Sequence, residues 1–205
     1  MRALADRPRG NEWVEFADRL DAGASGKALV STQVYWNSDF ATHSTDTYSM
    51  SVHMHSIRTI GGACVNEQGK LSQRMSDGTM AVYHKGDEYD GVWPVLDYMR
   101  PPGTTTAMNN EQLGCGNAKL PTYSKCTFVG GAASNSSSFG TLAMDTHYDD
   151  KLHAPRTWFL MPEGMVTLGQ SFMAEGDFPL ATTLEQRKRS GSVWIASTES
   201  GGKPV

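Results

Sequence analysis

The feature that most constrains the fold is an alternation of polar and apolar residues in DTYSMSVHMHSIRT, residues 46–59. In an extended strand, successive side chains point to opposite faces. One face would carry apolar side chains and the other serines and histidines: Tyr48, Met50, Val52 and Met54 against Ser49, Ser51, His53 and His55. The pattern predicts a long strand that is buried on one face and polar on the other.

Similar short segments follow along the rest of the chain. Further strands are expected at 29–36, 79–84, 92–98, 125–130, 139–145, 156–161, 164–169 and 192–197. Turn-forming stretches rich in glycine, proline and aspartate separate many of them, such as SDG at 76–78, PPG at 101–103 and PEG at 162–164. Many strands at this spacing indicate an all-β, antiparallel sandwich.

Helical periodicity is confined to the start of the chain. Trp13, Phe16, Ala17 and Leu20 share one face, and glycines in DAGASG end the pattern. We therefore expect a short N-terminal helix and linker over 1–25, a β-sandwich domain over 26–198 and a flexible tail over 199–205.

Composition excludes several function classes. The 205 residues carry a net charge of -4 without a basic stripe, so nucleic acid is not expected as a partner. No apolar run is long enough to span a bilayer, and no signal peptide is visible at the N-terminus.

The chain has three cysteines, Cys64, Cys115 and Cys126. Cys115 and Cys126 could form a disulfide, or all three thiols could be unpaired. No cysteine or histidine cluster has zinc spacing, so no metal ligands are predicted.

The stretch YDGVWPVLDYMRPPGTTT at 89–106 resembles the β-domain of polysaccharide lyase family 8, whose members cleave hyaluronan, chondroitin and, in some cases, xanthan. Five further blocks resemble family segments in the same order: HSIRT at 55–59, SDGTMAVYHKGDEY at 76–89, FVGGAASNSSSFGTLAMD at 128–145, KLHAPRTWFLMPEGMVTLG at 151–169 and TTLEQR at 182–187. The resemblance implies an antiparallel β supersandwich of the galactose-mutarotase-like type.

The same resemblance implies a second component. In the family, a helical α/α toroid precedes this domain and carries most of the catalytic Asn, His, Tyr and Arg residues. Nothing in this chain corresponds to the toroid, apart from the helix at 11–21 as a remnant or linker. A toroid domain or chain and an acidic polysaccharide are therefore the expected partners, and a secreted or periplasmic location is implied.

Family lyases act by β-elimination at a uronic acid, which requires neutralisation of the carboxylate, a base and an acid. With Arg58-Thr59 and Ser76-Asp77-Gly78 as anchors, the family's cleft asparagine falls on Asn66, whereas its supporting glutamate falls on Ala63. The resemblance thus assigns Asn66 and Arg58 as catalytic residues, while the family's supporting glutamate is absent. Each residue also has a structural interpretation: Asn66 as an asparagine in a turn, and Arg58 as an arginine in an ion pair.

Other side chains are candidates for substrate binding. His53 and His55 would share the polar strand face, with His84 across from them, although such histidines are usually sheet-face or solvated residues. Tyr89 and Trp93 could stack on sugar rings or belong to the core, and Arg100 could bind the anionic chain. No cofactor is predicted, except that Asp87, Glu88 and Asp90 could hold a structural Ca²⁺ in place of a solvated turn.

Two function classes remain. The first is a polysaccharide lyase, or its β-part. The second is a non-catalytic glycan-binding or structural module derived from a lyase, although an acidic chain without an arginine cluster is a poor ligand for polyanions.

Overall fold

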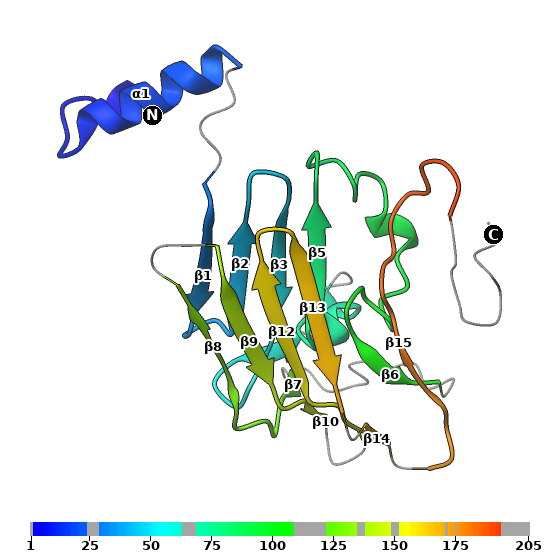
Figure 1. Cartoon of the computed structure of the whole chain (residues 1–205). Helices are drawn as coiled ribbons and strands as arrows, with labels where there is room; N and C mark the ends of the chain where they lie inside the picture. Colours follow the sequence, from blue (N-terminus) through cyan, green and yellow to red (C-terminus); the bar gives the residue numbers. More distant parts are fainter. Residues whose placement is uncertain are drawn as a thin grey trace.

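The structure is a computed structural model that describes residues 2–23, 29–62, 69–108, 122–134, 138–148, 152–170, 172–174 and 176–193 (Figure 1). Two four-stranded antiparallel sheets face each other. The first contains β1 (Ser31–Tyr35), β2 (Phe40–Ser44), β3 (Ser49–His53) and β5 (Thr79–Tyr83), in the order β1-β2-β3-β5. The second has the order β13-β12-β9-β8 and contains β8 (Val129–Ala133), β9 (Gly140–Met144), β12 (Arg156–Met161) and β13 (Gly164–Gly169). The predicted all-β sandwich is confirmed.

Among the described residues, three smaller sheets accompany the two large ones. β4 (Ile60–Gly62) pairs with β7 (Thr122–Tyr123), and β6 (Thr105–Ala107) pairs with β15 (Leu180–Thr182). A third small sheet has the order β10-β11-β14 and is formed by β10 (His147–Tyr148), β11 (Leu152–His153) and β14 (Met173–Ala174). Three 3₁₀ helices, η1 (Arg2–Leu4), η2 (Ser72–Arg74) and η3 (Trp93–Val95), complete the described elements together with α1 (Gly10–Asp21).

The core lies between the two large sheets, and the apolar residues of the alternating pattern at 46–59 point into it. Met50 and Val52 of β3 pack with Leu142 of β9 and with Trp158 and Leu160 of β12, and all of these side chains are buried. Because apolar area removed from water contributes about 25 cal/mol per Å², this layer is the main source of fold stability. The outward neighbours Ser49 and Ser51 are half-buried and polar, as predicted.

Several strand predictions differ from the structure. The predicted strands at 79–84, 139–145, 156–161 and 164–169 correspond to β5, β9, β12 and β13. The strand expected at 92–98 is wrong, because Pro94 lies in the first turn of a 3₁₀ helix instead. The segment expected at 125–130 becomes a strand only at Val129. Of the last predicted strand, only residues 192–193 are described, and they are not extended in a sheet.

Helix α1 confirms the N-terminal helix and ends at Asp21, directly before the predicted glycine break. It packs against η1 and stands apart from the two large sheets (Figure 1). Most of its apolar face is not covered, since Trp13, Phe16 and Leu20 are 42%, 41% and 56% exposed, whereas Ala17 is buried. Within the described part of the chain, no helix has the length and apolar character needed to cross a membrane.

Candidate functional site

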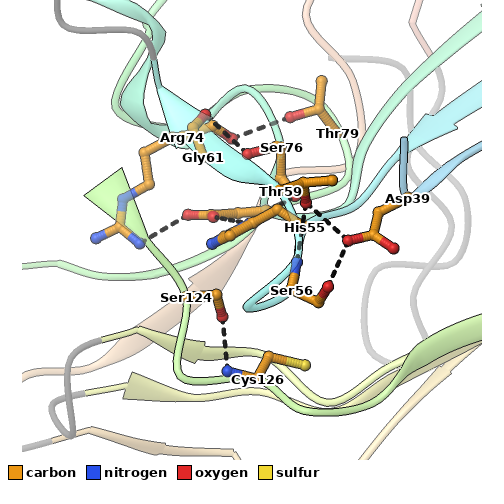
Figure 2. A network of polar contacts seen from close by, with 11 residues as sticks. Asp39, His55, Ser56, Thr59, Gly61, Arg74, Ser76, Thr79, Ser124 and Cys126 are labelled. Carbon is orange, nitrogen blue, oxygen red and sulfur yellow. Dashed lines mark hydrogen bonds and ion pairs between the residues drawn. The ribbon is translucent and has the colours of Figure 1, made fainter. Parts of the chain in front are cut away.

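A buried carboxylate, Asp39, organises the end of the first sheet. It lies in the turn between β1 and β2 with a positive φ of 47°, and its side chain points into the protein (Figure 2). Its Oδ2 accepts hydrogen bonds from Ser56 Oγ at 2.6 Å and from Thr59 Oγ1 at 2.7 Å, and its Oδ1 pairs with Arg58 Nη2. All three named residues of the Ser-x-Arg-Thr motif therefore bind one carboxylate.

The motif segment at 56–59 connects the two sheets. Arg58 Nη2 also donates to the carbonyl of Val129 in β8 at 3.1 Å, and the Ile57 N–H donates to the carbonyl of Cys126 at 2.9 Å. Arg58 is thus the structural ion-pair arginine of the alternative interpretation. Its side chain nevertheless remains 45% exposed to solvent.

The hydrogen bonds to Asp39 also set its charge state. Burial alone would raise the pKa of this carboxyl group. The bonds from Ser56 and Thr59 and the ion pair with Arg58 outweigh burial, and the pKa of Asp39 is lowered below its ordinary value. Asp39 is therefore ionised at neutral pH and is unsuited to donate a proton.

A second buried cluster lies beside the first (Figure 2). His55 Nδ1 is 3.1 Å from the carbonyl of Ser76 and 3.3 Å from Asp77 Oδ1, and Arg74 Nη1 donates to Asp77 Oδ2 at 3.1 Å. Ser76 Oγ donates to the carbonyl of Gly61 in β4 at 2.8 Å. Ser76 and Asp77 of the SDG stretch are therefore both used in structural contacts.

Glycines at both ends of the segment 62–78 allow close contacts with neighbouring parts of the chain. A Cβ on Gly62 would lie 2.9 Å from Gln73 Cα, so only glycine allows this approach of β4 to η2. Gly78 has a positive φ of 84°, and a Cβ there would meet the Trp158 ring at 3.1 Å. The predicted catalytic Asn66, together with Ala63 and Cys64, lies outside the described residues; the structure describes the two ends of its segment.

The predicted histidine face is not observed. His53 is exposed on the outer face of β3, whereas His55 follows the strand and is buried, because Ser76 and Asp77 bind it from the inside. His84 lies beyond Tyr83 at the opposite end of the sheet, where Nδ1 contacts the carbonyl of Thr47 at 3.2 Å. Thr79, and not His84, is the residue across from His53.

Tyr89 is a core residue. It is 6% exposed, and its hydroxyl accepts the Val82 N–H at 3.1 Å and donates to Glu185 at 3.1 Å. Burial raises the pKa of Tyr89, so its phenol stays protonated at neutral pH. Trp93, by contrast, is 48% exposed, and its ring lies 6.3 Å from that of Tyr89.

The TTLEQR block holds the segment that contains these aromatic residues. Gln186 Oε1 accepts the Asp97 N–H at 2.9 Å, and its Nε2 donates to the carbonyls of Asp97 and Arg100. Arg100, predicted to bind substrate, pairs with Asp97 at 3.0 Å. The block is therefore a clamp on residues 89–100, while the substrate-binding roles of Trp93 and Arg100 stay predictions.

In the acidic turn at 85–91, Glu88 binds backbone groups of the turn itself. The carboxylate of Glu88 accepts the backbone N–H groups of His84, Lys85 and Gly86 at 2.8, 2.8 and 3.0 Å, which lowers its pKa to about 2. Among the residues that the structure describes, no group of three or more His, Cys, Asp or Glu side chains could hold a metal ion. A calcium ion at Asp87, Glu88 and Asp90 is thus still only a prediction.

Sequence reasoning missed the most important side chain, Asp39, and gave no role to Arg74 or Arg156. Arg156 is buried, its Nη2 contacts Thr105 Oγ1, and burial lowers its pKa to about 10. Cys126 is a buried free thiol whose Sγ donates to the carbonyl of Phe128 at 3.0 Å, whereas Cys64 and Cys115 lie outside the described residues. The one available signal for Asp39 was its position in a polar turn before a strand.

The buried polar cluster around Asp39 and Asp77 can hold the ends of the segment 62–78 in place, and it includes one arginine, Arg58, that is partly exposed. Asp39, His55, Asp77 and Arg74 are buried and bonded to one another or to the backbone, so they form a support. Within this cluster, Arg58 combines a place in the support with a side chain that is 45% exposed, which suits it to bind an anion.

Known proteins with similar sequences include several lyases. Residues 30–204 match the family model described as polysaccharide lyase family 8, super-sandwich domain. Chondroitinase-AC of Pedobacter heparinus is 27% identical over 203 residues, and hyaluronate lyase of Thermasporomyces composti is 27% identical over 165 residues. These alignments cover 97% and 77% of this chain, but only 28% and 20% of those proteins.

Solved structures agree with the sequence comparison. A structure of a chondroitinase AC lyase superposes with a TM-score of 0.78 at 26% identity, covering 92% of this chain and 28% of that one. A Paenibacillus xanthan lyase has a TM-score of 0.70 at 22% identity, which supports the shared fold. The chain therefore spans less than a third of the proteins that it resembles.

Proposed function

This chain belongs to polysaccharide lyase family 8 through its super-sandwich domain, and from that membership we propose that it is the β-part of a lyase that cleaves an acidic glycan. The reaction is β-elimination at a uronic acid of a polymer such as hyaluronan or chondroitin. The names of its relatives support this substrate class, since they include chondroitinase, hyaluronate lyase and xanthan lyase.

The observation that carries the proposal is the arrangement of Arg58. Its pairing with buried Asp39 holds Nη2 of the guanidinium, while the side chain stays 45% exposed. A fixed arginine can bind a carboxylate in bidentate fashion and lower the cost of charge that develops next to it. Arg58 would therefore orient the uronate, and Asn66 would add a hydrogen bond to the same group.

The base and the acid would come from a partner. The described residues near Arg58 are ionised, buried or held in structural bonds, and none of them has the features of a general base beside an open site. We propose that a helical α/α toroid domain or chain supplies these groups, as the 28% coverage of Chondroitinase-AC supports. A secreted or periplasmic location belongs to the same proposal.

One observation favours a second candidate function. The motif residues Ser56, Arg58 and Thr59 are all explained by their bonds to Asp39, without any substrate. A non-catalytic glycan-binding or structural module derived from a lyase would retain the same motif.

Ultraviolet absorbance separates the two candidates, because β-elimination produces an unsaturated uronate that absorbs more strongly than the substrate. Purified chain is incubated with hyaluronan, chondroitin sulfate, alginate and xanthan, alone and with a separately produced helical domain of a family member. We expect product from one glycan in the presence of the helical domain. Asn66→Ala should abolish it, whereas Asn11→Ala, an exposed residue of α1, should not. No product from folded protein under any of these conditions would reject the lyase function and leave the module.

A further inference from the structure

The outer face of the first sheet carries a row of rings at one end. Tyr35, Phe40 and His53 are register partners on β1, β2 and β3, so their side chains leave the sheet side by side. The ring centroids of Tyr35 and Phe40 are 6.1 Å apart, and those of Phe40 and His53 are 5.7 Å apart. Tyr35 and His53 are exposed and Phe40 is half-buried, which leaves the rings in contact with solvent.

A polar surface continues from this row along the strands. The remaining outward positions bear short hydroxyl or amide side chains, namely Ser31, Gln33, Thr42, Ser44, Ser49 and Ser51. None of the outward side chains of these three strands, all of which are described, has a carboxylate, ammonium or guanidinium group. Such a face offers hydrogen-bond donors and acceptors without fixed charge.

The row is continuous with the candidate site. The turn between β1 and β2 exposes Trp36, which is 67% accessible, and also Asn37 and Ser38. The next residue of that turn is Asp39, whose carboxylate holds Arg58. One end of the sheet therefore combines exposed rings, polar side chains and the partly exposed side chain of Arg58.

We propose that the three register partners Tyr35, Phe40 and His53, together with Trp36 of the adjoining turn, form a stacking surface for the pyranose rings of a glycan; these four residues are here called the aromatic row. A pyranose ring has apolar C–H faces and a hydroxylated edge, and the aromatic row with its neighbouring serines and threonines matches both. A partner attracted by charge would require fixed charges on this face, which it lacks. That the glycan is acidic, with its carboxylates toward Arg58, rests on the proposed function.

Affinity electrophoresis tests the aromatic row directly. The chain is run through gels that contain hyaluronan, chondroitin sulfate, xanthan or neutral dextran, and its retardation gives an apparent Kd. We expect retardation by an acidic glycan, with Tyr35→Ser and Trp36→Ser each weakening it about five- to tenfold, as the loss of one stacked ring predicts. Phe159→Ser is the matched control, because Phe159 is also an aromatic residue exposed on the outer face, but of the other sheet.

The outcomes keep this inference separate from the lyase function. Equal retardation of the wild type, the row variants and the control would overturn the aromatic row, whatever the enzyme assay shows. Absence of retardation in every gel, from protein with an unchanged unfolding transition, would overturn it as well. Retardation that depends on Tyr35 and Trp36, without any product by ultraviolet absorbance, would support the row and count against the lyase. A change in oligomeric state on Tyr35→Ser, with unchanged glycan retardation, would identify a protein interface and reject the proposal.

Discussion

At the scale of single residues, Asp39 shows what sequence alone could not predict. Its bonding partners lie 17, 19 and 20 positions away, so no local pattern connects them to it. The sequence identified the motif at 55–59 correctly, but could not show that Ser56, Arg58 and Thr59 serve a carboxylate in another turn. The same limit applies to His55, which local alternation placed on the polar face and tertiary bonds draw inward.

Replacing Asp39 with asparagine should destabilise the sandwich while preserving its shape. The change removes the charge that Arg58, Ser56 and Thr59 bind, and we expect a loss of about 2 kcal/mol in the free energy of unfolding by urea, because Arg58 is partly solvated. Asp97→Asn is the control, since it breaks a solvent-exposed pair with Arg100 and should cost less than about 1 kcal/mol.

The difference between wild type and Asp39→Asn should also depend on pH. The pKa of Asp39 is lowered in the folded state, so its contribution is complete above the ordinary value of 3.8 and is lost as the pH falls through the folded-state pKa. Unfolding measured from pH 7 downward should therefore show a constant gap between the two proteins, followed by convergence below about pH 4. A gap that is unchanged down to the acid limit of folding would contradict the ionic role of Asp39.

Gly78 and Gly86 form a matched pair for backbone strain. Both have a positive φ, but a Cβ at Gly78 would press on Trp158 and Met144, whereas nothing lies within 4 Å at Gly86. Gly86→Ala should cost about 1 kcal/mol from backbone strain alone, and Gly78→Ala about 2–4 kcal/mol from strain plus overpacking. Thermal unfolding compares them; equal shifts in Tm would show that packing around Trp158 relaxes freely.

At the scale of elements, prediction succeeded where the pattern was local. β12 and β13 begin and end where the sequence placed them, because strong alternation meets a Pro-Glu-Gly turn. β2 was missed, since its inward positions are Ala41 and His43, and a histidine obscures the apolar alternation. His43 is buried there because Thr32 Oγ1 and the carbonyl of Met161 bind its ring at 2.8 and 3.1 Å. Burial lowers the pKa of His43, which keeps it neutral in the core.

The segment 89–100 should depend on its clamp. Gln186→Ala removes bonds to the backbone of Asp97 and Arg100, so we expect faster amide hydrogen exchange across residues 92–100 while β5 is unaffected. Arg189→Ala, which alters an exposed side chain further along the same segment, should leave exchange at 92–100 unchanged. Equal protection of 92–100 in all three proteins would assign the stability of this segment to the Tyr89, Val92 and Leu96 cluster instead.

At the scale of the whole molecule, the order of the family blocks predicted the fold better than any single element did. Six resembling segments spread over the chain imply one architecture, and the two facing sheets with a TM-score of 0.78 to a family structure match it. The candidate site was only partly predictable. Its anchors at 55–59 and 76–78 were identified, but the contacts of His55 that join them and the carboxylate of Asp39 that holds the first anchor are tertiary contacts.

Helix α1 should be dispensable for the stability of the sandwich. It packs on η1 and leaves Trp13, Phe16 and Leu20 exposed, so removal of residues 1–23 takes away little buried area from the sheets. We expect calorimetry to show a Tm within about 2 °C of the full chain, and less self-association on size-exclusion chromatography. A fall in Tm of 5 °C or more would mean that α1 covers part of the sandwich in solution.

The bonds around Asp39 have a consequence for how lyase-like sequences are recognised. Because folding alone requires Ser56, Arg58 and Thr59, natural selection for a stable sandwich is enough to preserve this motif after catalysis has been lost. A search that relies on Ser-x-Arg-Thr would therefore retrieve descendants of the fold, active and inactive alike. Conservation of residues that have no bonding partner inside the domain would be better evidence that a descendant is still an enzyme.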